Sequence, residues 1–83
     1  MNTFTTYILY SRSKNRYYVG HTGNFSRRFI EHNSGQNIST KFGAPWELIF
    51  TKEFTTKSDA YHLEIKIKKR GISRFLSDHN LPG

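Results

Sequence analysis

An acidic side chain interrupts an apolar stripe in the C-terminal half of this sequence. Ala60, Leu63 and Ile67 recur at spacings of three and four, which predicts one apolar face of a helix. Glu64 falls within that face, four residues after Ala60. An ion pair with Lys68, one helical turn later, is the ordinary explanation for such a glutamate. Binding of a metal ion is the alternative.

A second group that could do chemistry lies on an earlier predicted helix. Arg28 and His32 are four residues apart and therefore share a helix face, while Phe25 and Phe29 form the neighbouring apolar surface. An arginine at this position could clamp a phosphate. The alternative is a solvated helix face that includes Arg27 as well.

Two tyrosines in strand-like segments could act with these groups if the strands bring their phenols together. Tyr7 and Tyr18 belong to segments 4–10 and 17–19, whose β-branched and aromatic residues predict a hairpin. A connection of even length, such as residues 12–15, puts both phenols on one face within diagonal reach, and an odd length separates them. Packing is the alternative for each tyrosine taken singly.

Several basic residues near the end of the second helix could hold a phosphate backbone without reading bases. They are Lys66, Lys68, Lys69, Arg70 and Arg74. Their alternative role is a solvated helix end that the helix dipole favours. Arg27 and Gly20 complete the predicted nucleic-acid-binding set. Gly20 ends the second strand, so it marks either a bend or a place where another backbone comes close.

The elements that must position these residues follow from local signals. Asn24 is a good N-cap for a helix over 25–33, and Gly35 is a stop just beyond it. The polar segment 34–45 is typical of a loop, and 46–54 is typical of a third strand.

The second helix is predicted over 57–70, because Thr56 and Asp59 resemble a capping box. Gly71 supplies a left-handed stop, and Ser73 caps a last short helix over 74–78. The order β-β-α-β-α-α predicts a small α/β (α+β) sandwich. In it, a three-stranded, mainly antiparallel sheet is flanked by helices in one domain over residues 1–83.

Composition narrows the class of partner. The chain has 83 residues, a formal net charge of +7 and no cysteine, so disulfides, thiolate nucleophiles and cysteine-based zinc sites are excluded. The four histidines show no pair at helical zinc-motif spacing. Such a basic charge favours a polyanion, most commonly nucleic acid. Nothing in the sequence resembles a membrane span or signal peptide, which indicates a soluble, cytoplasmic protein.

Taken together, these motifs resemble those of the GIY-YIG nuclease family over positions 5–70. The resemblance rests on Tyr7, on Tyr-Val-Gly at 18–20, on Arg28 with His32, and on Glu64 in a later helix. It is closest to short stand-alone bacterial proteins similar to the nuclease domain of excinuclease C. The first motif departs from the family, because Thr-Thr-Tyr replaces Gly-Ile-Tyr.

The resemblance implies a catalytic constellation of Tyr7, Tyr18, Arg28, His32 and Glu64. Glu64 would be the protein ligand of Mg²⁺ or Mn²⁺, which otherwise binds water and a phosphate oxygen. Arg28 would neutralise charge growing on the attacked phosphate. A phenol with an unperturbed pKa of about 10 would orient or deprotonate the water, with Tyr18 slightly favoured over Tyr7 and His32 sharing the proton transfer.

The sequence therefore predicts a metal-dependent endonuclease that acts on DNA, with RNA not excluded. We expect structure-selective or weakly selective cleavage, in DNA repair or processing, and a repair protein is a possible partner. The first alternative is a nucleic-acid-binding module that has kept the fold but does not cut. The second is an adaptor that binds a repair protein through an aromatic surface.

Overall fold

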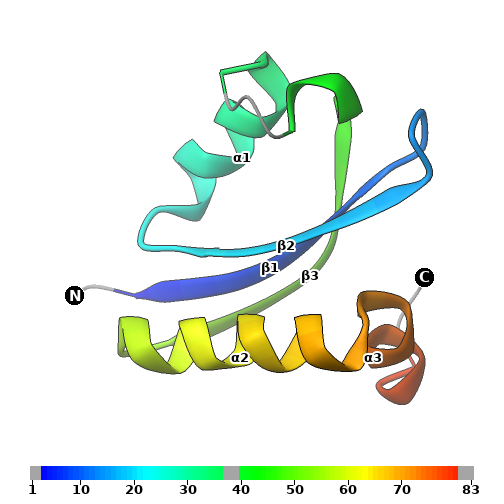
Figure 1. Cartoon of the computed structure of the whole chain (residues 1–83). Helices are drawn as coiled ribbons and strands as arrows, with labels where there is room; N and C mark the ends of the chain where they lie inside the picture. The colour runs from blue at the N-terminus through cyan, green and yellow to red at the C-terminus, as the bar shows by residue number, and fades with distance from the viewer. Residues whose placement is uncertain (1–2, 37–39, 81–83) are drawn as a thin grey trace.

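The structure, a computed structural model, describes residues 3–36 and 40–80 and consists of a three-stranded sheet with helices on both faces (Figure 1). The elements are β1 (Phe4–Ser11), β2 (Arg16–Thr22), α1 (Phe25–Ser34), η1 (Lys41–Gly43), β3 (Trp46–Phe54), α2 (Lys57–Arg70) and α3 (Ile72–Asp78). Both the predicted α+β class and the order β-β-α-β-α-α are confirmed. The short 3-10 turn η1 lies in the segment predicted as a loop.

The sheet has the order β2-β1-β3, and both pairings are antiparallel. β1 is rich in β-branched and aromatic residues, which suit a central strand whose two faces are both covered. β2 therefore lies at an edge of the sheet. The pairing of β1 with β3 shifts register between Ile8 and Leu9, and burial along β3 accordingly departs from strict alternation.

Alternation along the strands divides the core into two clusters, one on each face of the sheet. The cluster on the α1 face has Tyr7, Leu9 and Trp46 at its centre. The cluster on the opposite face joins the sheet to α2 and α3, and its buried members are Ile8, Val19, Ile67, Phe75 and Leu76. Figure 1 shows α1 on one side of the sheet and α2 with α3 on the other.

The predicted helix signals are found in the structure with their capping geometry. The Asn24 side chain accepts a hydrogen bond from the Arg27 backbone N–H, and Gly35 ends α1 in the left-handed region with φ 81°. The Thr56 side chain accepts from the Asp59 backbone N–H at the start of α2. These caps fix the helices that carry Arg28 and Glu64.

Two predictions near the last helix were wrong. Ser73 does not cap α3, because α3 begins at Ile72 and its N-cap is Gly71, so Ser73 lies inside the first turn. Gly71 has the positive φ expected of a stop, at 94°, but its ψ of 131° lies outside the left-handed helical region. This one glycine ends α2 and starts α3, which leaves no separate capping residue between them.

The predicted loop also includes residues 37–39, which lie outside the described residues. Within the part of the chain that the structure describes, no helix has the length and apolar character needed to cross a membrane.

Candidate active site

The two candidate phenols lie on the same face of the sheet. Tyr7 pairs with Gly20 and Leu9 pairs with Tyr18, across a connection of four residues at 12–15. The sequence alone did not decide between a connection of even and of odd length. The structure has an even one, which is the case that puts both phenols on one face. The rings of Tyr7 and Tyr18 lie diagonally, 6.3 Å apart between centroids.

The phenol of Tyr7 is buried against α1 and bonded to His32. Its side chain is 1% exposed, and its Oη lies 2.9 Å from Nε2 of the fully buried His32. Burial raises the pKa of Tyr7 to about 12, although contact with the Arg28 guanidinium opposes the rise. Tyr7 therefore holds its proton in the resting protein.

His32 completes a buried chain of polar contacts. Its Nδ1 lies 2.7 Å from the hydroxyl oxygen of Thr40, which is also buried. Burial, and then the positive charge of Arg28, lower the pKa of His32, so the imidazole is neutral near pH 7. A protonated Tyr7 favours the tautomer in which Tyr7 donates to Nε2 and Nδ1–H donates to Thr40.

Arg28 stands at the mouth of this cluster, where the protein meets solvent. Its side chain is partly exposed, and its guanidinium lies 3.3 Å from the Glu31 carboxylate. The contact with Tyr7 raises the pKa of Arg28, so its charge is permanent. Arg27, by contrast, points to solvent and reaches Glu31 only at 3.6 Å. The two arginines therefore differ in their surroundings: Arg28, which matches the family motif, contacts Tyr7, whereas Arg27 faces solvent.

Gly20 makes room for the Tyr7 phenol. A Cβ atom at position 20 would lie 2.7 Å from Oη of Tyr7 and 2.9 Å from Cζ, closer than side chains tolerate. The group that approaches this glycine is a side chain and not another backbone.

Glu64 lies on the opposite face of the sheet and is held by a histidine and a lysine side chain. It is 8% exposed, its Oε1 lies 2.7 Å from Nδ1 of His21, and its Oε2 lies 2.6 Å from Nζ of Lys68. Burial alone would raise the pKa of Glu64, but the bonds from His21 and Lys68 together hold it below its ordinary value. The carboxylate is ionised, and the predicted pair with Lys68 is present.

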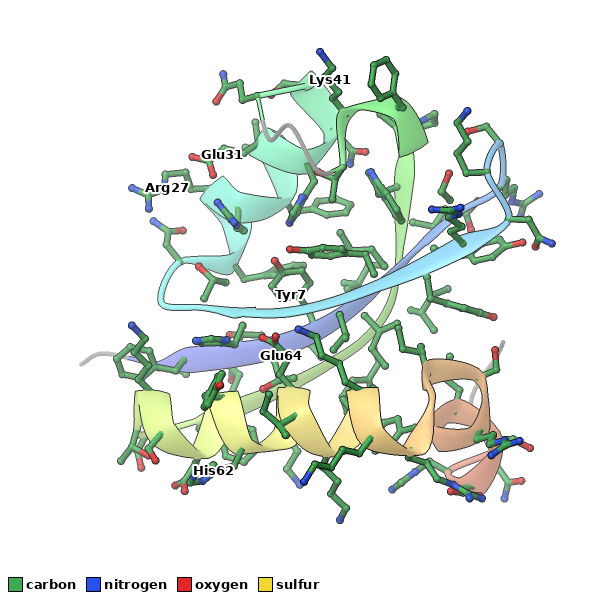
Figure 2. All side chains as sticks on the ribbon, viewed as in Figure 1. Tyr7, Arg27, Glu31, Lys41, His62 and Glu64 are labelled. Carbon is green, nitrogen blue, oxygen red and sulfur yellow. The ribbon has the colours of Figure 1, made fainter. Side chains whose placement is uncertain are left out.

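The predicted catalytic residues therefore form two groups around the edge strand β2. Tyr7, Tyr18, Arg28 and His32 gather on the α1 face, whereas Glu64 lies on the α2 face. Figure 2 shows Tyr7 and Glu64 on the two sides of β2. In residues 3–36 and 40–80, no hydrogen bond or ion pair joins Glu64 to the other group. The groups interact through space, because the charge of Glu64 contributes to the raised pKa of Tyr7.

The donor set at Glu64 suits a hard divalent cation. The described residues contain no cluster of three or more His, Asp or Glu side chains, so Glu64 would be the principal protein ligand beside water and phosphate oxygens. Each carboxylate oxygen keeps a lone pair beyond its present bond. The Lys68 ammonium already shows that a cation is stable against Oε2, and its half-exposed side chain can leave.

Some of the predicted basic residues near the end of α2 are paired with acidic side chains, and the others are not. Lys68 pairs with Glu64, and Arg70 makes two bonds of 2.8 and 3.0 Å to Asp78. Lys66, Lys69 and Arg74 are exposed, and no ion pair holds them within the described part of the chain. These three keep their charge available for an external anion.

Sequence reasoning missed three residues that support the site. His21 was considered only as a possible zinc ligand, although it directly follows Gly20 and alternation turns it toward α2. Trp46 donates from its indole to the Thr40 carbonyl at 2.8 Å and thereby fixes the residue that orients His32. No pattern in the sequence marks Thr40.

Comparison with known proteins shows which family the chain resembles. The model of the GIY-YIG catalytic domain matches residues 3–76. A UPF0213 protein from Limosilactobacillus reuteri is 36% identical over 81 residues, covering 90% of this chain and 83% of the relative. The UPF0213 protein YazA of Bacillus subtilis is 39% identical over 56 residues, covering 66% and 57% respectively.

A solved structure agrees with the fold as well. The solution NMR structure of a UPF0213 protein from Bacillus halodurans has a TM-score of 0.57 and 28% sequence identity, and it covers 90% of this chain and 83% of that one. Because the matched model spans nearly the whole chain and the motif residues gather around one strand, the chain belongs to the GIY-YIG nuclease family.

Proposed function

We propose that this protein is a metal-dependent endonuclease that hydrolyses phosphodiester bonds in DNA. The observation that carries the proposal is the ionised Glu64 on α2, whose charge acts across β2 on the pKa of Tyr7, the phenol that contacts Arg28. A divalent metal bound by Glu64 would supply Lewis-acid stabilisation of the phosphate oxygens.

The chain's own residues divide the remaining work. Arg28, permanently charged and partly exposed, binds the phosphate and offsets the charge that grows during attack. Tyr18 takes the proton of the attacking water, because it is half-buried and so nearer to solvent. Tyr7 is fully buried and holds its own proton. Its role, with His32 bonded to it, is to position Arg28.

The reaction balances without a further reactant. Water adds its oxygen to phosphorus, the bond from phosphorus to the leaving oxygen breaks, and the water proton passes to the phenol oxygen of Tyr18 as that phenol gives its own proton to solvent. The leaving oxygen then takes up a proton from solvent.

The direct test is a cleavage panel of flap, branched, nicked and single-stranded DNA and of RNA, with Mg²⁺ or Mn²⁺. We expect wild-type protein to cut at least one DNA substrate and Glu64→Gln to bind it without cutting. Glu53→Gln, which alters an exposed carboxylate in β3, is the matched control and should cut normally. Tyr18→Phe should lose far more activity than Tyr7→Phe.

A non-catalytic nucleic-acid-binding module is the second candidate, favoured by one observation. Both oxygens of Glu64 are already bonded to side chains of the protein itself, one to His21 and the other to Lys68. Salt-sensitive binding, with no cleavage of any substrate under any metal, would support this candidate. Equal cleavage by wild type and Glu64→Gln would contradict the proposed role of Glu64.

A further inference from the structure

A groove separate from the predicted phosphate-binding residues opens beside the hairpin that joins β1 to β2. It has a volume of about 400 Å³ and lies between the start of β2 and η1. Its lining consists of Lys14, Arg16, Phe42, Gly43 and Trp46. Neither the predicted catalytic set nor the basic end of α2 contributes to it.

The groove carries positive charge without compensation. Lys14 and Arg16 are exposed, and within residues 3–36 and 40–80 neither takes part in an ion pair. Lys41 adds a cation beside the lining residue Phe42, with its ammonium 4.9 Å from the centroid of the Phe42 ring. Arg12 at the same hairpin is different, because Glu47 neutralises it. No acidic residue lines the groove among those that the structure describes, which suits an anionic ligand.

An aromatic ring is exposed beside these cations. Phe42 is 73% exposed, more than any other large hydrophobic residue that the structure describes. The opposite wall is the buried Trp46, which packs so closely on Gly43 that no side chain would fit there. An exposed ring next to free cations is the combination by which proteins stack bases and hold the adjoining phosphates.

The groove is continuous with the candidate active site. Arg16 and Tyr18 stand on the same face of β2, two residues and thus about 7 Å apart along the strand. Ser11 pairs with Arg16 on one side and with Trp46 on the other, which places these two side chains in one row across the sheet. The Trp46 ring lies 6.2 Å from the ring of Tyr18.

We propose that this groove binds an unpaired nucleotide of a single-stranded segment next to the scissile phosphate. The base stacks on Phe42, and Lys14, Arg16 and Lys41 hold the flanking phosphates. Stacking on a side chain needs a base that is free of its duplex neighbours, so the groove selects single-stranded over fully paired nucleic acid. The inference rests on the proposed nuclease function and names its substrate class.

The test uses the full chain in EDTA, so that binding is measured without cleavage. Trp46 is the only tryptophan, and its emission should report directly on the groove. The probe is a thymidine oligonucleotide of about a dozen nucleotides, compared with a hairpin duplex of similar length. We expect Phe42→Ala to weaken single-strand binding about tenfold and duplex binding less than about twofold.

Matched variants separate stacking from charge and from folding. Ile30→Ala removes another exposed hydrophobic side chain, on α1, and should bind as the wild type does. A Lys14→Ala, Arg16→Ala double variant should reduce the salt dependence of single-strand binding by a slope of about 1.4, whereas Lys52→Ala, Lys57→Ala should not. Thermal melts should show all variants folded, because every altered side chain is exposed.

Phe42→Ala protein that binds single strands as tightly as wild type would overturn the proposal. So would an equal loss of single-strand and duplex binding. Phe42-dependent binding without cleavage under any metal would support the groove while contradicting the nuclease function, so the two failures are distinguishable.

Discussion

At the scale of single residues, Lys68 has a contact that bears on metal binding. Its ammonium lies 2.6 Å from Oε2 of Glu64, where a divalent cation would bind. The contact raises the pKa of Lys68 and lowers that of Glu64, so both are charged at neutral pH. A metal ion that binds Glu64 must therefore displace Lys68 or share the carboxylate with it.

We predict that Lys68→Met binds Mn²⁺ more tightly than wild type, by roughly fivefold, because a positive charge no longer opposes the metal. The measurement is Mn²⁺ titration followed by electron paramagnetic resonance, without nucleic acid. Lys69→Met, which removes the next lysine on the same helix, is the control and should leave the affinity unchanged. Weaker Mn²⁺ binding by Lys68→Met would show that Lys68 supports the carboxylate and does not compete at it.

At the scale of elements, the pairing of β1 with β2 sets the position of the Tyr7 phenol. The register places Gly20 directly opposite Tyr7, and the missing side chain at position 20 leaves the space that Oη occupies. The bond from Tyr7 to His32 on α1 depends on this position. One glycine in β2 thus controls how α1 attaches to the sheet.

Gly20→Ala should destabilise the protein by about 1–3 kcal/mol, because the added methyl group overpacks against the phenol. Chemical denaturation measures the change. Gly23→Ala is the matched control, since a Cβ there would meet Phe4 at an ordinary 3.5 Å. A free energy of unfolding for Gly20→Ala within about 0.5 kcal/mol of wild type would show that Tyr7 can move aside without cost.

The sequence predicted these elements well where the signal is local. Asn24, Gly35 and Thr56 act on backbone groups within a few residues, and their roles in the structure are the predicted ones. Ser73 failed as a cap because α2 and α3 meet at a single residue, Gly71, which local patterns do not reveal.

The contacts of the candidate site were predictable only where the two residues are close in the sequence. The contact of Glu64 with Lys68 follows from helical spacing, but its contact with His21 spans 43 positions and depends on how α2 packs against β2. Thr40 lies in a segment without periodicity, so its bond to His32 leaves no mark in the sequence. That the predicted catalytic residues divide between two faces follows only from the placement of the helices.

At the scale of the whole molecule, ion pairs decide where the positive charge remains available. Arg12, Lys68 and Arg70 are each bonded to an acidic residue. Among the described residues, two groups of cations without such partners flank β2: one at the groove beside the hairpin, and the other at Lys66, Lys69 and Arg74 on α2 and α3. A nucleic acid that passes over the open edge of β2 would meet cations on both faces of the sheet, with Tyr18 and Glu64 between them.

The stability of the whole molecule should depend on pH through Tyr7. Burial raises the pKa of this phenol in the folded protein to about 12, from 10.0 in the unfolded chain. Below about pH 10 both states are protonated, and the stabilising contribution is complete. As pH rises from about 10 through about 12, the unfolded chain releases a proton that the folded protein retains, so the free energy of unfolding falls.

We predict that wild type loses roughly 1 kcal/mol more than Tyr7→Phe between about pH 9 and about pH 11, since each pKa unit corresponds to about 1.4 kcal/mol. Urea denaturation at a series of pH values measures the difference. Tyr61→Phe, which alters an exposed phenol on α2, should follow the wild-type curve. Parallel curves for wild type and Tyr7→Phe would mean that Tyr7 ionises as easily in the folded protein as in the unfolded chain. Tyr7 would then be available as a general base, and the assignment of that role to Tyr18 would fail.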